Sequence, residues 1–155
     1  MDAGVNIALG TDNMTEDMFQ AMTIGSIVHR GSRGGGIDPQ PQAMLDAATR
    51  NGALSLGRLE DIGSIEPGKK ADLTLVNLDH PSLRPAINLV SNIVHYGNPG
   101  VVDSVMVDGE FLMLDGKVIC LDEREVVENA QAAIEGAWLR LHVQSPDVPL
   151  PPSLR

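Results

Sequence analysis

Two Asp-Gly dipeptides, Asp108-Gly109 and Asp115-Gly116, constrain the fold more than any other feature of this sequence. Apolar runs flank both dipeptides, and this pattern is the strongest short-range signal for a two-residue β-hairpin turn. Two such turns in series predict a β-meander, with strands at 104–107, 111–114 and 117–119. A further strand is predicted at 71–76, after a turn at 63–70. The second half of the chain therefore cannot be purely helical.

The first sixty residues have a different pattern. An apolar run at 5–9, broken only by Asn6, predicts a largely buried strand that ends in a turn at 10–13. A helix is predicted at 15–28 with Thr15 as its N-cap, followed by a glycine-rich loop at 31–36. Shorter helices are predicted around 44–52, 54–57 and 86–95.

The last helix has a clear predicted start, because Asp122 with Glu125 three residues later forms a capping-box pattern. An apolar stripe then follows helical spacing through Val126, Ala130, Ile134, Trp138 and Leu141. Four prolines predict a stiff, non-helical tail. The predicted regions are 1–62, 63–121, 122–143 for the terminal amphipathic helix, and 144–155 for the tail.

Composition excludes several classes of partner. The net charge of −10 and an aromatic content of 3% argue against nucleic acid and anionic membrane surfaces, which require clustered basic residues or stacking platforms. No apolar run approaches the roughly 20 residues that span a bilayer. A single cysteine, Cys120, permits neither an internal disulfide nor a cysteine-based metal site, and a cytoplasmic location is expected.

Asp12 is the candidate catalytic residue. It comes directly after the predicted strand at 5–9, and barrel enzymes build their active sites at the carboxyl ends of such strands. A carboxylate there could bind a divalent metal and accept a proton from an attacking water. The pattern alone also fits an ordinary turn or helix cap, so both interpretations stay open at this point.

Two other patterns favour structural roles. Residues 63–69 satisfy G-x-x-x-x-G-K, but Lys70 replaces the required Ser or Thr, Pro67 removes an amide donor, and a strand rather than a helix follows. The pattern is therefore interpreted as a Pro-Gly turn rather than a phosphate-binding loop. The four histidines show neither H-x-H nor H-x-x-x-H spacing, so no self-contained zinc site is visible.

Four ordered motifs together resemble the amidohydrolase superfamily, in particular its cytosine deaminase, guanine deaminase and triazine chlorohydrolase-like branch. They are residues 8–12, residues 47–57, residues 62–73, and the two Asp-Gly turns. The resemblance implies an α/β fold: the last strand-helix units of a (β/α)₈ TIM-type barrel, the C-terminal part of a small β-sandwich domain, and a terminal helix.

The resemblance also assigns roles to residues. Asp12 matches the family's strand-eight aspartate, which binds the metal and moves a proton from the attacking water to the leaving group. Asn13 would lie near the substrate. The implied parent enzyme hydrolyses C–N bonds of a small nitrogen heterocycle, with Zn²⁺ as the metal and Fe²⁺ as the alternative. The other implied partners are the N-terminal barrel portion and, through exposed apolar surface, a second copy of the chain.

The rival hypothesis is a non-catalytic, stand-alone β-domain that serves as an interaction or regulatory module. A TIM-type barrel takes about 250 residues, whereas this chain has 155 and supplies one of the eight expected barrel strands. In the family, further histidines complete the metal site, and the strands that carry them are not in this sequence.

We therefore expect the 155-residue chain alone to bind catalytic metal poorly and to show no turnover, because a catalytic zinc ordinarily takes three protein ligands. The measurement is deamination across a panel of nitrogen heterocycles after incubation with Zn²⁺. Clear activity that Asp12→Ala abolishes would contradict this expectation.

Overall fold

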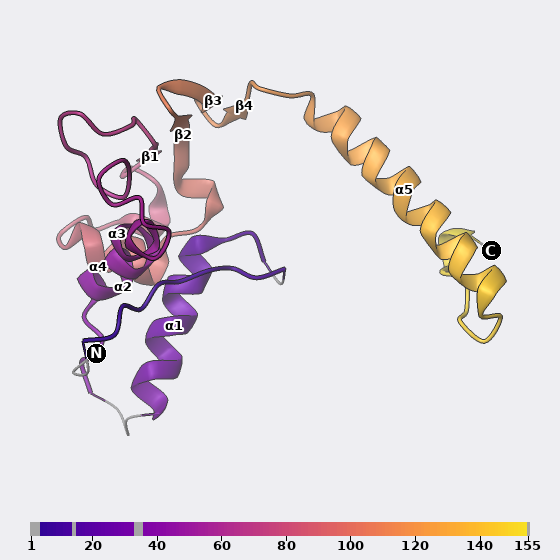
Figure 1. Ribbon diagram of the computed structural model, residues 1–155, viewed down its shortest axis with the longest axis horizontal. Coiled ribbons are helices and arrows are strands. Elements are labelled where there is room, and N and C mark those ends of the chain that lie inside the picture. Colours follow the sequence, from indigo (N-terminus) through magenta and orange to yellow (C-terminus); the bar gives the residue numbers. More distant parts are fainter. Residues whose placement is uncertain (1–3, 14, 33–35, 155) are drawn as a thin grey trace. The chain divides into compact units, whose positions relative to one another are not determined.

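The computed structural model describes residues 4–13, 15–32 and 36–154, and it divides into two compact units (Figure 1). Unit 1 comprises residues 1–117 and unit 2 residues 118–155. Unit 1 holds four α-helices and the described strands, except that the last strand, Lys117–Val118, crosses its boundary, whereas unit 2 is built around one long helix. The finer domain limits at 62, 121 and 143 stay predictions.

A cluster of four helices forms the core of unit 1. The helices are α1 (Met18–Ser32), α2 (Pro41–Ala48), α3 (Arg50–Ser55) and α4 (Leu89–Tyr96). Met22 from α1, Met44 from α2 and Val94 from α4 are buried against one another, and Leu9 and Phe19 pack on them. Burying such side chains contributes about 1.5–3 kcal/mol each.

Helix α1 begins and ends later than its predicted bounds of 15–28. Thr15 is not the cap, because the Asp17 carboxylate accepts hydrogen bonds from the backbone N–H groups of Phe19 and Gln20, at 2.9 and 3.2 Å. A carboxylate next to the first turn satisfies free N–H groups and suits the positive helix end. The helix continues to Ser32, and the predicted glycine-rich loop falls partly on residues 33–35, outside the described residues.

The four described strands form one antiparallel sheet in the order β1-β2-β3-β4. They are β1 (Leu73–Val76), β2 (Val102–Val107), β3 (Glu110–Leu114) and β4 (Lys117–Val118). Val107 pairs with Glu110 across the first turn, and Leu73 pairs with Met106 across β1 and β2.

Both predicted Asp-Gly turns are confirmed. Asp108 and Gly109 have φ values of 51° and 86°, and Asp115 and Gly116 have φ values of 48° and 74°. Positive φ at both central residues is the requirement of a type I′ hairpin, and this turn matches the twist of the strands it joins.

The predicted strand at 5–9 is wrong for this chain. Residues 4–10 form no β-ladder, and Val5 and Ile7 are 69% and 37% exposed rather than largely buried. A strand needs a neighbouring strand to receive its backbone hydrogen bonds, and the described residues offer none at this position. The predicted sandwich is likewise represented by a single sheet within the described part of the chain.

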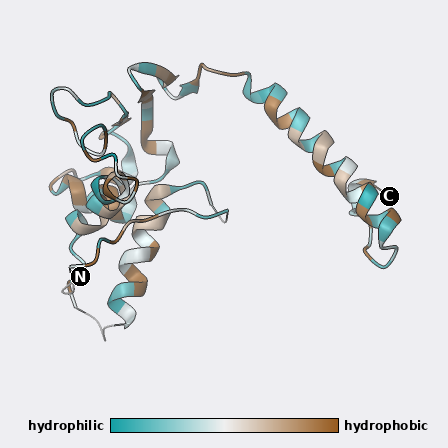
Figure 2. Ribbon diagram, viewed as in Figure 1, coloured by the Kyte–Doolittle hydropathy of each residue, from teal (hydrophilic) through white to brown (hydrophobic). Residues whose placement is uncertain are grey.

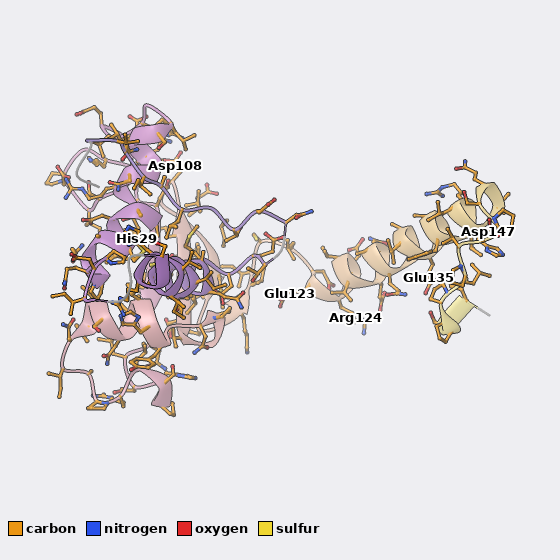
Figure 3. The ribbon with its side chains drawn as sticks, turned by 90° about the horizontal axis from the view of Figure 1, so that it is seen from below. His29, Asp108, Glu123, Arg124, Glu135 and Asp147 are labelled. Atoms are coloured by element: carbon orange, nitrogen blue, oxygen red, sulfur yellow. The ribbon has the colours of Figure 1, made fainter. Side chains whose placement is uncertain are left out.

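Unit 2 contains α5 (Glu123–Gln144), and its predicted start is confirmed. Asp122 accepts hydrogen bonds from the N–H groups of Arg124 and Glu125, at 3.0 and 3.1 Å. Hydrophobic and hydrophilic residues alternate along the α5 ribbon (Figure 2), and the side chains of Glu123, Arg124 and Glu135 project from the helix (Figure 3). The predicted non-helical tail contains one short 3-10 helix, Pro152–Leu154.

The described residues thus form a mixed fold of α-helices and one small antiparallel sheet. Short 3-10 helices at Pro81–Leu83 and Pro99–Val101 connect the sheet to α4. Across the described residues, no helix has the length and apolar character to cross a membrane.

Gly63→Ala should destabilise the chain more than Gly68→Ala. Both glycines have a φ near +90° (92° and 93°), so an alanine costs about 1–3 kcal/mol in backbone strain at either position. At Gly63 the added Cβ would also lie 2.6 Å from the Ala53 Cβ, whereas Gly68 faces open space. We expect Gly63→Ala to lower the free energy of unfolding in urea by about 1–3 kcal/mol more than Gly68→Ala does. Equal losses in the two variants would contradict the close packing of Gly63 on Ala53.

Candidate active site

Helices α2 and α3 hold the segment 4–10 through side-chain and backbone hydrogen bonds. The Leu9 N–H donates to the Ala47 carbonyl oxygen, at 2.9 Å. Asn51 Nδ2 donates to the Ile7 carbonyl oxygen, at 2.8 Å. Asn6 Nδ2 donates to the Asn51 carbonyl oxygen, at 3.0 Å. These bonds replace a strand ladder and fix the segment that leads into the candidate site.

Asp12 lies just beyond this anchored segment, in a left-handed conformation with a φ of 54°. Its Oδ1 atom accepts a 2.8 Å hydrogen bond from the Asn13 N–H, so the two predicted site residues are in direct contact. Among the described residues, Oδ2 accepts no hydrogen bond, and the side chain is exposed. One carboxylate oxygen is thus oriented by the backbone, and no described residue binds the other.

Among the described residues, the histidines of unit 1 do not form a metal-binding group with Asp12. His80 caps a short 3-10 helix by accepting from the Ser82 N–H, at 3.2 Å. His95 lies against Tyr96, and burial, followed by the charge of Arg30, holds its pKa below the usual value. His29 lies on α1 (Figure 3).

Within the described ranges, no three His, Cys, Asp or Glu side chains are grouped so as to hold a metal. A catalytic zinc takes three protein ligands plus a water, and this part of the chain offers Asp12 as a single candidate ligand. The described residues therefore do not fit a complete zinc site, although an exposed carboxylate is a suitable member of one.

The loop at 63–70 does not resemble a phosphate site in its geometry. Lys69 Nζ is 2.5 Å from the Leu59 carbonyl oxygen and 2.7 Å from Ser64 Oγ, so the lysine ties the loop together from inside. A hydrogen bond from Ser64, followed by Lys69, lowers the pKa of Glu66 below its usual value. The ionised Glu66 carboxylate therefore stabilises the folded loop at neutral pH, and this stabilisation is lost as the pH falls through the lowered pKa of Glu66.

Comparison of the sequence with known proteins identifies the family of this chain. The amidohydrolase family model matches residues 1–112. The 5-methylthioadenosine/S-adenosylhomocysteine deaminase of Syntrophomonas wolfei is 36% identical over 138 residues, covering 84% of this chain and 31% of that protein. The 5′-deoxyadenosine deaminase of Methanosarcina acetivorans is 34% identical over 139 residues, covering 87% and 32%.

Solved structures agree with this assignment. An adenosine deaminase from Xanthomonas campestris with bound zinc matches with a TM-score of 0.80 at 29% identity, covering 84% of this chain and 31% of that one. The atrazine chlorohydrolase of Arthrobacter aurescens, complexed with zinc, matches with a TM-score of 0.76 at 23% identity, covering 84% and 30%. The latter likeness is one of fold alone.

This chain belongs to the amidohydrolase family, as its sequence motifs indicated. It spans about a third of the length of the curated relatives that it matches, 31% and 32% of the two named above. The activity and substrates of a whole enzyme therefore enter below as proposals.

Sequence reasoning missed the contact between Asn6 and Asn51. Asn6 was visible only as an interruption of an apolar run, and Asn51 only as part of a family motif. The signal that could have paired them is a polar residue inside a predicted buried strand, which requires a hydrogen-bonding partner.

Lys69→Met should lower stability more than Lys70→Met. Lys69 is 11% exposed and makes charged hydrogen bonds to Leu59 and Ser64, whereas Lys70 is 40% exposed and its side chain pairs with Asp108 at the surface. We expect losses of about 2 kcal/mol and under about 1 kcal/mol, respectively, in urea unfolding. ATP should leave the melting temperature unchanged, and an ATP-dependent rise that Lys69→Met removes would contradict the structural role of Lys69.

Proposed function

We propose that this chain is the C-terminal part of a metal-dependent hydrolytic deaminase that acts on a small nitrogen heterocycle. Asp12 is its metal ligand and proton shuttle, and Asn13 lies beside the substrate. The observation that carries the proposal is the state of Asp12: it follows an anchored segment, has a left-handed backbone, and has an Oδ2 atom that no described residue binds. Non-glycine residues in sparsely populated backbone regions cluster at functional sites.

Hydrolytic deamination replaces a ring amino group with oxygen. Water adds to the ring carbon, the bond from that carbon to the amino nitrogen breaks, and ammonia leaves. Asp12 would be one ligand of a divalent metal, which would acidify the attacking water near neutral pH. Asp12 Oδ2 accepts a proton from the water and returns it to the departing nitrogen, so the carboxylate ends each cycle ionised.

Asn13 has a supporting role in this proposal. Its backbone N–H donates to Asp12 Oδ1, which leaves Oδ2 as the oxygen that moves the proton. A hydrogen bond from a backbone N–H stabilises the ionised carboxylate and fixes its orientation. The Asn13 side chain is exposed beside the carboxylate, where a substrate would meet it.

The substrate class that we propose is an adenine nucleoside, with the exocyclic amino group as the leaving group. Relatives at 34–36% identity are named as deaminases of 5-methylthioadenosine, S-adenosylhomocysteine and 5′-deoxyadenosine. The triazine hydrolases are 23% identical and support the fold only, so we favour deamination over dechlorination. Zinc is the proposed metal because the adenosine deaminase of Xanthomonas campestris carries it.

The partner of this chain is, in our proposal, the N-terminal barrel portion. Val5, Ile24, Ile27 and Val28 are between 49% and 69% exposed along the segment 4–10 and α1. Contiguous exposed apolar surface marks an interaction site or causes self-association. We propose that the barrel portion covers this surface, and that the chain self-associates without it. A cytoplasmic location stays a prediction.

Asp12→Asn should abolish deamination of 5′-deoxyadenosine by the full-length enzyme that contains this chain. The amide keeps the size of the side chain but removes the proton acceptor, so we expect kcat to fall by about 100-fold or more, since general base catalysis contributes about 10²–10⁴-fold. The measurements are kcat from the absorbance change of the adenine ring and zinc content by atomic absorption.

Asp115→Asn is the matched control. Asp115 is also an exposed aspartate with a left-handed backbone, but it lies in a hairpin turn of the sheet. Its substitution should leave kcat within about twofold, because surface changes away from a site act weakly. Equal losses in the two variants, or an active Asp12→Asn, would overturn the assignment of Asp12.

A further inference from the structure

Asn6 and Asn51 form a reciprocal pair of amide contacts, which we call the asparagine clasp. Asn6 Nδ2 donates to the Asn51 carbonyl oxygen at 3.0 Å, and Asn51 Nδ2 donates to the Ile7 carbonyl oxygen at 2.8 Å. Ser55 Oγ supports the clasp, because it lies 2.8 Å from Asn6 Nδ2 and 3.0 Å from the Asn51 carbonyl oxygen. Each side chain thus binds the backbone of the opposite segment.

The clasp fixes the segment 4–10 in two ways. The hydrogen bond from Asn51 to the Ile7 carbonyl oxygen fixes the position of the segment along the length of α3. The hydrogen bond from the Asn6 side chain fixes the rotation of the segment about the segment's own axis. The bond from the Leu9 N–H to Ala47 adds one further anchor before Asp12. Side chains of an extended segment alternate in direction, so a slip by one residue would turn the following positions to the opposite side.

We propose that Asn51 is a positioning residue for Asp12. In this role Asn51 acts through the backbone rather than by contact with substrate or metal. Its Nδ2 donor holds Ile7, and the backbone from Ile7 through Leu9 carries Asp12 to its place. This inference rests on the proposed function, in which Asp12 moves the proton and binds the metal. Small displacements of a reacting group, on the order of 1 Å, cost about 100-fold in rate, so a remote hydrogen bond can control turnover.

The test compares Asn51→Asp with Asn92→Asp in the full-length enzyme that contains this chain. Asn51→Asp keeps the shape of the side chain but removes the Nδ2 donor. Asn92, on α4, also donates from Nδ2 to backbone carbonyls, those of Leu83 and Pro85, at 2.8 and 2.9 Å. Asn92→Asp therefore removes the same kind of bond at a place that does not lead to Asp12.

We expect Asn51→Asp to lower kcat by about 10- to 100-fold while KM changes by less than about threefold. Exchange of the Leu9 amide hydrogen should accelerate by about tenfold or more, because its anchor loosens. Asn92→Asp should leave kcat and Leu9 exchange within about threefold, although its melting temperature also falls. A kcat of Asn51→Asp within about threefold of the wild type, or an equal fall in Asn92→Asp, would overturn the positioning role.

Two further variants keep the inference falsifiable. Asn6→Ala removes the other half of the clasp at an exposed position, and it serves as the test if Asn51→Asp does not fold. We expect a smaller fall in kcat for Asn6→Ala, about 3- to 10-fold. Wild-type turnover in Asn6→Ala would overturn the positioning role. Asp12→Ala distinguishes a failure of the proposed function from a failure of the positioning role. Activity in Asp12→Ala overturns the proposed function and the positioning role together, whereas an inactive Asp12→Ala beside a fully active Asn51→Asp overturns the positioning role alone.

Discussion

The hydrogen bonds that tie the segment 4–10 to helices α2 and α3 are the interaction on which the candidate site depends. Without a neighbouring strand, the backbone of this segment has to satisfy its polar groups elsewhere. Ala47 and Asn51 supply two of those partners from adjacent helices, and Ser55 accepts a hydrogen bond from the Asn6 side chain. Because Leu9 also packs against the core cluster of Met22, Met44 and Val94, the same segment joins the polar anchors to the apolar core. The position of Asp12 is therefore set by unit 1.

Local features of the fold were predictable from the sequence, and non-local ones were not. The Asp-Gly turns and the Asp122 cap depend on residues within a few positions of each other, so the local sequence pattern was sufficient to predict them. The strand at 5–9 depends on a neighbouring strand, and no property of residues 5–9 reveals whether one is present. The clasp joins residues 45 positions apart, a separation at which sequence spacing carries no information about contact.

The loop at 63–70 shows why a sequence motif requires its structural context. The G-x-x-x-x-G-K pattern places a lysine where a phosphate-binding loop would have one, yet Lys69 points into its own loop and binds Leu59 and Ser64. A phosphate site uses free backbone N–H groups at a helix start, and here a strand follows. The departures at Pro67 and Lys70 were sufficient to predict this outcome from the sequence.

Three aspartates of the described chain adopt a left-handed backbone, and their contexts separate Asp12 from the other two. Asp108 and Asp115 each precede a glycine in a hairpin whose turn type requires positive φ. Asp12 precedes Asn13 and belongs to no hairpin, so no strand pairing accounts for its conformation. Aspartate tolerates this region because its short side chain bonds to nearby backbone, as Oδ1 does to the Asn13 N–H. The conformation directs one carboxylate oxygen to the backbone, and no described residue binds the other, which agrees with the proton transfer that we propose for Asp12.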